Sequence, residues 1–154
     1  MTVALNTITL NFDQTSNLIC HVGHKRTILA EGHMGIGKSS MLASIGKQLK
    51  ELKSKDYLLC YCDCTTKDVG DIMIPVIHEI DDSGKFVRFV TNEELGAHTG
   101  KPVVIMLDEF GKCNRAVQNA LRRLMLERKI GSYTLHPDSI IFATTNLGAE
   151  NVGD

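Results

Sequence analysis

The most constraining feature of this 154-residue sequence is a glycine-rich segment, residues 32–39, that ends in lysine and serine. It reads Gly-His-Met-Gly-Ile-Gly-Lys-Ser and fits the pattern G-x-x-x-x-G-K-[ST]. An apolar run ends just before it, and a helical pattern begins directly after it. Glycines let the backbone turn its N–H groups inward, and the N-terminus of the following helix adds a partial positive charge. The segment therefore predicts a cradle for phosphate groups between a strand and a helix.

Two side chains of this cradle have predicted roles. Lys38 supplies a positive charge to the β- and γ-phosphates of a nucleotide, and the Ser39 hydroxyl is a ligand for Mg²⁺. The residues expected to contact the nucleotide are Gly32, His33, Met34, Gly35, Ile36, Gly37, Lys38, Ser39 and Ser40. The alternative is a glycine-rich turn that happens to precede a helix. The strand and helix on either side favour the phosphate site.

The rest of the chain alternates short apolar runs with helical patterns, which is typical of a parallel sheet with helical crossovers. Apolar residues recur at helical spacing over residues 39–53 and again over 114–128. The expected fold is therefore α/β, a three-layer αβα core in one domain over residues 1–154. The four expected strands are Thr27–Ala30, Tyr57–Cys62, Val103–Leu107 and Ile140–Thr144.

One stretch departs from this alternation. Two β-prone segments, Val76–Ile80 and Phe86–Val90, flank the turn-forming residues 81–84. They predict a β-hairpin inserted before the third core strand. A second, smaller excursion is expected over Ile130–Pro137, because Gly131 and Pro137 break the regular pattern there.

Polar side chains follow the last two expected strands. Asp108 and Glu109 come directly after an apolar run, and open α/β sheets bind ligands at the carboxyl ends of their strands. We expect Asp108 to hold Mg²⁺ through water and Glu109 to polarise an attacking water molecule. Asn146 ends the neighbouring strand and is placed to reach the γ-phosphate or that water. Each residue alone is more often a strand end or a turn, but together with the glycine segment they favour a catalytic site.

Composition narrows the other possibilities. Seventeen basic and 18 acidic residues nearly cancel, so charge gives no case for a nucleic-acid or membrane partner. No apolar run approaches the roughly 18 residues of a membrane span, and a soluble, cytoplasmic protein is expected. The five cysteines are an odd number, which favours reduced, buried thiols over a disulfide scaffold. They are Cys20, Cys60, Cys62, Cys64 and Cys113.

Taken together, these motifs resemble the nucleotide-binding core of an AAA+ ATPase, most closely the MoxR-like branch. Residues 32–39 correspond to Walker A, residues 103–109 to Walker B, and Asn146 to sensor 1. Residues 117–139 also resemble the MoxR-like helix and small hairpin between Walker B and sensor 1. The resemblance implies ATP and Mg²⁺ as cofactors, a homo-oligomeric ring, and hydrolysis that remodels or helps assemble a partner protein.

In that family an arginine finger, a fifth strand, sensor 2 and a helical lid follow sensor 1, and no stretch of this sequence matches them. Arg122, Arg123 and Arg128 precede sensor 1 and are expected to lie on a solvated helix face. Two further functions stay open. One is a nucleotide-gated binding module with little turnover, and the weaker one is a small P-loop kinase.

Overall fold

The computed structural model describes residues 8–33, 37 and 40–146. None of the helices in these ranges is long and apolar enough to cross a lipid bilayer. The helices are α1 (Phe12–Val22), α2 (Met41–Lys53), α3 (Val69–Ile72) and α4 (Arg115–Glu127). The strands are β1 (Ile28–Gly32), β2 (Leu58–Asp63), β3 (Met73–Ile80), β4 (Gly84–Thr91), β5 (Val103–Asp108), β6 (Lys129–Ile130), β7 (Tyr133–Thr134) and β8 (Ile140–Asn146).

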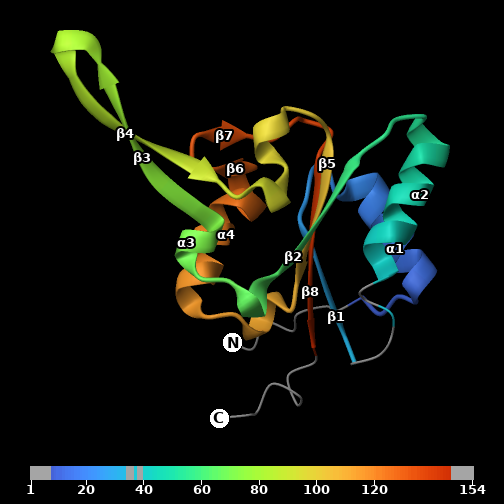
Figure 1. Ribbon diagram of the computed structural model, residues 1–154. Coiled ribbons are helices and arrows are strands. Elements are labelled where there is room, and N and C mark those ends of the chain that lie inside the picture. Colours follow the sequence, from blue (N-terminus) through green and yellow to red (C-terminus); the bar gives the residue numbers. More distant parts are fainter. Residues whose placement is uncertain (1–7, 34–36, 38–39, 147–154) are drawn as a thin grey trace, which may run out of the picture.

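A four-stranded parallel sheet in the order β1-β8-β5-β2 forms the centre of the molecule. Helices α1 and α2 lie on one face and α4 lies on the other (Figure 1). The expected three-layer αβα fold is confirmed. Each core strand lies within two residues of its expected bounds. Helix α1 was not predicted, although Asn11 and Gln14 form a capping box at its start.

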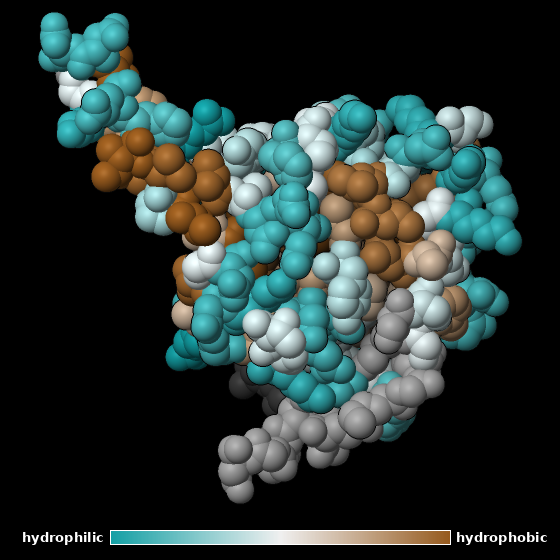
Figure 2. Space-filling view, in the orientation of Figure 1, coloured by the Kyte–Doolittle hydropathy of each residue, from teal (hydrophilic) through white to brown (hydrophobic). Residues whose placement is uncertain are grey.

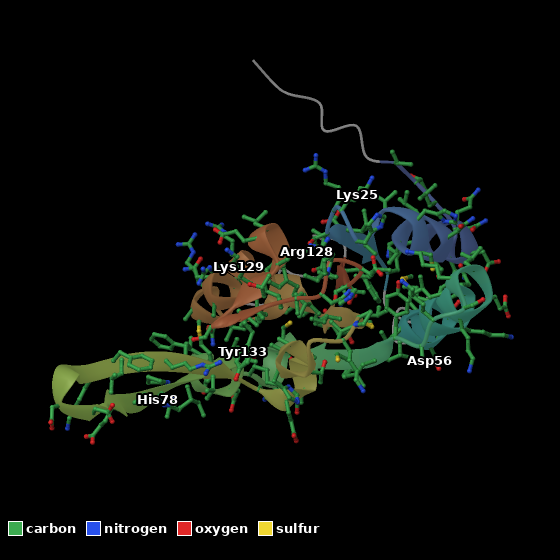
Figure 3. All side chains as sticks on the ribbon, turned by 90° about the horizontal axis from the view of Figure 1, so that it is seen from above. Lys25, Asp56, His78, Arg128, Lys129 and Tyr133 are labelled. Atoms are coloured by element: carbon green, nitrogen blue, oxygen red, sulfur yellow. The ribbon has the colours of Figure 1, made fainter. Side chains whose placement is uncertain are left out.

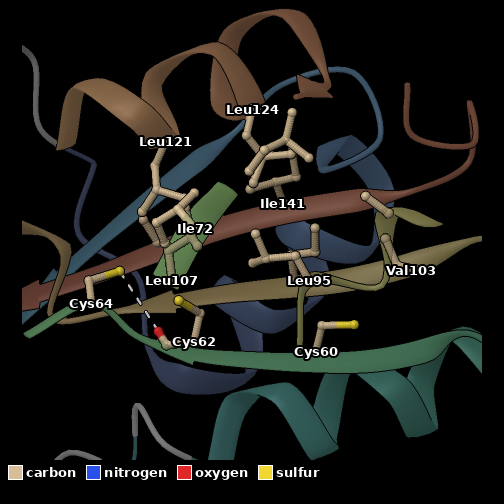
Figure 4. Close-up of a cluster of buried hydrophobic side chains, with 14 of the residues drawn as sticks. Cys60, Cys62, Cys64, Ile72, Leu95, Val103, Leu107, Leu121, Leu124 and Ile141 are labelled. Carbon is tan, nitrogen blue, oxygen red and sulfur yellow. Dashed lines mark hydrogen bonds between the residues drawn. The ribbon is translucent and has the colours of Figure 1, made fainter. Parts of the chain in front are cut away.

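Strand β5 is buried over its whole length, so its alternating side chains build two separate cores. Val103, Ile105 and Leu107 point toward α4 and pack with apolar residues of that helix, among them Leu121 and Leu124 (Figure 4). Val104 and Met106 point the other way, into the core beneath α1 and α2. Asp108 has the same parity as these last two residues and therefore faces the helix that follows the glycine segment.

All five cysteines are buried and carry free thiols, as expected. Cys64 Sγ donates a weak hydrogen bond to the Cys62 carbonyl oxygen at 3.8 Å (Figure 4). Burial raises the pKa of Cys60 to about 11, so this thiol stays protonated and inert. Across the described ranges, no cluster of His, Cys, Asp and Glu side chains is arranged to hold a metal ion.

Strands β3 and β4 form the expected hairpin, an antiparallel ribbon that projects well beyond the sheet (Figure 1). Its base is anchored by hydrogen bonds to two other segments. Ser132 N, in the turn between β6 and β7, donates to Phe89 O at 3.0 Å, and the Asn92 side chain donates to Asp71 O at 2.9 Å. The β6–β7 hairpin is the second expected excursion.

The expectation that Arg128 lies on a solvated helix face is wrong. Helix α4 ends at Glu127, and Arg128 adopts a left-handed conformation with φ of 60°. Its guanidinium donates to Ser139 O at 2.9 Å and to Gly23 O at 2.7 Å. The side chain therefore connects the end of α4 to the start of β8 and the end of α1.

Gly131 provides a test of the hairpin's anchorage. It has φ of +53°, and a Cβ atom there would lie 2.6 Å from Phe89 O. We expect Gly131→Ala to lower the free energy of unfolding by about 2–3 kcal/mol, because backbone strain and a clash with main-chain oxygen add together. Gly100→Ala is the matched control, with φ of +66° and no atom within 4 Å of its Cβ. It should cost about 1 kcal/mol from strain alone. Equal losses in urea unfolding of the two variants would show that the contact with Phe89 contributes nothing.

Candidate functional site

The site lies at the carboxyl edge of the sheet, where the strands present polar side chains on one face. In β8, Ile140 and Phe142 belong to the core beneath α1 and α2, so Thr144 and Asn146 share that face. In β2, Cys60 and Cys62 point into the opposite core, which leaves Tyr61 on the α2 side. Three neighbouring strands thus direct polar groups to the space around Asp108.

Both carboxylate oxygens of Asp108 accept hydrogen bonds from hydroxyl groups. Tyr61 Oη donates to Oδ2 at 2.8 Å, and Thr144 Oγ1 donates to Oδ1. The backbone N–H of Glu109 also donates to Oδ1, at 3.1 Å. Asp108 is 9% exposed. Its carboxylate is therefore fixed in orientation at the edge of the buried sheet.

Glu109 departs from strand geometry immediately after Asp108. Its φ of 52° and ψ of 36° place it in the left-handed region, which costs a non-glycine residue roughly 1–2 kcal/mol. The turn directs its side chain away from the strand axis, and a 3₁₀ turn, Phe110–Lys112, follows. Glu109 Oε2 is buried, accepts no hydrogen bond within the described residues, and lies 3.5 Å from Lys112 Nζ. A strained backbone that supports a partly buried carboxylate is typical of a functional position.

Asn146 lies opposite the first residue of the glycine segment. In the parallel pairing of β1 with β8, Gly32 is the register partner of Asn146. Asn146 is 1% exposed. The start of the predicted phosphate cradle and the end of β8 are therefore side by side, and β5 lies on the other side of β8.

Part of the predicted cradle is described directly. Gly37 has φ of +87°, a conformation that favours glycine, and Ser40 N and Oγ both donate to Gly37 O, at 3.0 and 2.8 Å. His33 is exposed. The cradle residues Met34, Gly35, Ile36, Lys38 and Ser39 lie outside the described residues. The turn at Gly37 directly precedes α2, so the described part of the segment has the expected position between β1 and that helix.

Sequence reasoning missed Tyr61 and Thr144, the two hydroxyl donors to Asp108. Partial burial, followed by the hydrogen bond to Asp108, raises the pKa of Tyr61 to about 12. The phenol therefore remains a donor throughout the physiological pH range. In a strand, Tyr61 lies on the face opposite to that of Cys60 and Cys62, and this could be inferred from the sequence. The sequence did not show that β2 lies beside β5, so the contact of Tyr61 with Asp108 could not be predicted.

Gly111 was also missed. A Cβ atom there would lie 2.2 Å from Thr145 Oγ1, so the 3₁₀ turn after Glu109 packs directly on β8. Only glycine permits this approach without displacement of Thr145. The close packing fixes the turn that carries Glu109 relative to the end of β8.

These groups fit Mg²⁺ and a nucleotide. A hard cation with several bound waters is usually held by one or two carboxylates together with phosphate oxygens. Asp108 is an oriented carboxylate at the strand edge, and Glu109 Oε2 is buried without a hydrogen-bond donor among the described residues. Asp108 and Glu109 both lie at the carboxyl edge of the sheet, the edge at which β1 ends with Gly32 and from which the chain leads into α2.

Comparison with known proteins agrees with this geometry. The sequence profile of the AAA domain (dynein-related subfamily) matches residues 27–145. No curated protein sequence matches the chain. Among solved structures, NtrX from Brucella abortus superposes with a TM-score of 0.54 at 18% identity. The match covers 93% of this chain and 32% of NtrX, so the chain spans about a third of that protein's length. At this identity the likeness shows the fold alone.

The family match covers most of the chain and includes both Asp108 and the described start of the glycine segment. Its limits, residues 27 and 145, coincide with the first and last strands of the parallel sheet to within one residue. The chain therefore belongs to the AAA domain family, in its dynein-related subfamily, whose members are in general nucleotide-binding ATPases.

Proposed function

We propose that this chain binds ATP with Mg²⁺, hydrolyses it, and uses the reaction to remodel or assemble a partner protein as a MoxR-like AAA+ ATPase. The observation that carries the proposal is the meeting of Asp108, Glu109 and Asn146 at one sheet edge, opposite Gly32. The MoxR-like assignment draws on the sequence resemblance of residues 117–139, where the structure has α4 and the β6–β7 hairpin. A ring of identical subunits is part of the proposal.

Each residue has a distinct role in this proposal. Lys38 binds the β- and γ-phosphates, while Ser39 and Asp108 hold Mg²⁺, Asp108 through water. Bound Mg²⁺ would neutralise charge on the phosphate oxygens. Glu109 accepts a proton from the attacking water, and Asn146 orients that water or the γ-phosphate. The left-handed backbone at Glu109 turns its side chain out of the regular strand direction, and the two carboxylates serve different functions in this proposal.

A nucleotide-gated binding module remains the second candidate. It shares the binding residues and differs only in turnover. Steady-state phosphate release separates the two. Release that depends on both Mg²⁺ and Glu109 supports the ATPase, whereas tight ATP binding with no release supports the module.

Lys38→Ala tests nucleotide binding. The substitution removes a charged donor to the phosphates, and such contacts contribute about 1.5–3 kcal/mol each. We expect the affinity for Mg-ATP to fall by roughly tenfold to a hundredfold or more in a calorimetric titration. Lys47→Ala, an exposed position on α2, is the control and should leave affinity unchanged. Unchanged affinity in Lys38→Ala would refute the assignment of the cradle.

Glu109→Gln tests catalysis. The amide keeps the shape of the side chain but cannot accept the proton, so binding of Mg-ATP should persist while phosphate release falls by at least about a hundredfold. Glu127→Gln is the control, since Glu127 is exposed and forms an ion pair with Arg123 on α4. Both quantities are measured on the same preparation. Wild-type turnover in Glu109→Gln would assign the catalytic carboxylate elsewhere.

Tyr61→Phe tests the orientation of Asp108. Loss of the bond to Oδ2 frees one side of the carboxylate, and a net cost of about 1 kcal/mol corresponds to roughly a fivefold rise in the Mg²⁺ concentration needed for half-maximal hydrolysis. The maximal rate should change less. Tyr133→Phe is the control, because its ring contacts Arg88 far from the site. Equal Mg²⁺ requirements in the two variants would show that Thr144 and the Glu109 N–H orient the carboxylate without Tyr61.

A further inference from the structure

The β3–β4 hairpin exposes apolar side chains on both of its faces. The paired register places Ile77, Val87 and Phe89 on one face, with 67%, 52% and 43% of their surface exposed. Ile74 and Phe86 are on the other face, also exposed. Figure 2 shows this apolar surface along the hairpin, between its hydrophilic tip and the main body. A two-stranded ribbon is only marginally stable in water, so its exposed apolar surface indicates a binding function.

The alternation of hydrogen-bonded and non-hydrogen-bonded residue pairs in the hairpin shows which backbone groups point outward. Asn92 N donates to Ile72 O at 3.2 Å, in continuation of the register that pairs Met73 with Thr91. Because bonded and non-bonded pairs alternate in an antiparallel ladder, the pairs at 74/90, 76/88, 78/86 and 80/84 are the bonded ones. The N–H and C=O groups of residues 75, 77 and 79, and of 85, 87 and 89, therefore point away from the ribbon.

Two independent observations agree with this assignment of bonded and non-bonded pairs. Pro75 has no N–H and occupies an outward position, where none is needed. Phe89 O, also outward, accepts the hydrogen bond from Ser132 N. The alternation of the ladder therefore rests on two hydrogen bonds and on the position of Pro75.

The two edges of the ribbon differ in the outward backbone N–H and C=O groups that they present. Pro75 interrupts the donors on the β3 edge. The β4 edge is closed at its base by Ser132, and beyond it Val87 and Lys85 present their N–H and C=O groups with no hydrogen-bond partner in the described part of the chain. Tyr133 lies near the hairpin base and His78 farther out along the ribbon (Figure 3). The open edge is thus the outer half of β4.

We infer that this outer edge of β4 binds an extended segment of a partner protein, which adds to the hairpin as a third strand. Backbone N–H and C=O groups of the segment pair with those of Lys85 and Val87, and its apolar side chains pack beside that of Val87 on the adjacent strand β4, whereas Ile77 lies across the ribbon on β3. The segment runs antiparallel to β4, the pairing that is more stable per residue. This inference deepens the partner-binding part of the proposed function, but it concerns the hairpin alone and requires no nucleotide.

The charge of the hairpin tip specifies one end of the segment. Asp81 and Asp82 are exposed in the turn, and Glu79 is paired with Lys85 at 2.8 Å. The tip therefore carries an excess of negative charge, and an antiparallel segment ends beside it. The partner segment is expected to be an alternating apolar strand that ends in basic residues at its carboxyl terminus.

A second copy of this chain is a poorer occupant. If two β4 strands paired antiparallel about Val87, Lys85 of one copy would lie opposite Phe89 of the other. The edge at Phe89 is already covered by the β6–β7 turn, where Gly131 and Ser132 lie against Phe89 O. Self-pairing would therefore be limited to a few residues beyond this turn.

The probe is a fluorescent, C-terminally amidated peptide in which threonine and valine alternate over six residues and two arginines follow. Its affinity for the chain is measured by fluorescence anisotropy without nucleotide, and exchange of the Val87 and Lys85 amides is followed by NMR. We expect binding to protect both amides. A peptide with proline in place of its central valine should bind at least about tenfold more weakly, because it loses a main-chain donor.

Val87→Pro is the decisive variant of the chain. Val87 N–H points outward, so the substitution removes no bond within the hairpin and should weaken binding at least about tenfold. Ile77→Pro is the matched control, since it removes the equivalent outward N–H from the opposite edge and should change affinity by less than about twofold. Asp81→Asn combined with Asp82→Asn should weaken binding and reduce its dependence on salt.

Several results would overturn the inference. They are no binding of the peptide to the wild-type chain, binding without protection of the Val87 and Lys85 amides, or equal losses in Val87→Pro and Ile77→Pro. Protection of these amides that rises with concentration of the chain alone would identify a second copy as the occupant instead. Amide exchange in the wild-type chain decides the matter even if Val87→Pro fails to fold. ATP hydrolysis plays no part, so a failure here leaves the ATPase proposal intact, and the reverse also holds.

Discussion

The structure depends on the complete burial of β5. A strand buried on both faces must place every side chain in one of two cores. Because successive side chains point to opposite faces, the position of each residue in the strand determines the core that it enters. Val103, Ile105 and Leu107 fix α4, while Val104 and Met106 fix the layer of α1 and α2. Packing in both cores therefore sets the position and direction of the strand's last residue. Asp108 receives its orientation first from this packing and only then from the hydroxyls of Tyr61 and Thr144.

The residue after Asp108 obeys a different constraint. A regular strand would send Glu109 into the core of α4, where an unpaired carboxylate is costly. The left-handed turn at Glu109 avoids this, and the contact of Gly111 with Thr145 holds the turn against β8. The strain of one residue is thus maintained by packing that leaves no room for a Cβ. The turn therefore keeps the Glu109 carboxylate at the edge of the sheet and out of the core beneath α4.

The sequence was sufficient for the elements whose signals are local. Strands, helices α2 and α4, both hairpins and the polar residues at the strand ends followed from periodicity, turn residues and the glycine segment. It was insufficient where two distant segments meet. Tyr61 contacts Asp108 only because β2 lies beside β5. Arg128 binds Gly23 O only because the ends of α1 and α4, which lie on opposite faces of the sheet, come close to each other near the start of β8. Helix α1 was missed because its buried positions include Ser16 and Cys20, which weaken the apolar pattern.

The hairpin and the site are connected through contiguous packing. Strand β2 ends at Asp63, and the chain then passes through a 3₁₀ turn, Cys64–Thr66, and α3 before it enters β3. That turn contacts the one that follows Glu109, and α3 packs on α4. The base of the hairpin is therefore supported by the same segments that surround the two carboxylates. Because the outer ribbon has few contacts of its own, its direction is set at this base, where α3 packs on α4 and the Cys64–Thr66 turn packs on the turn after Glu109.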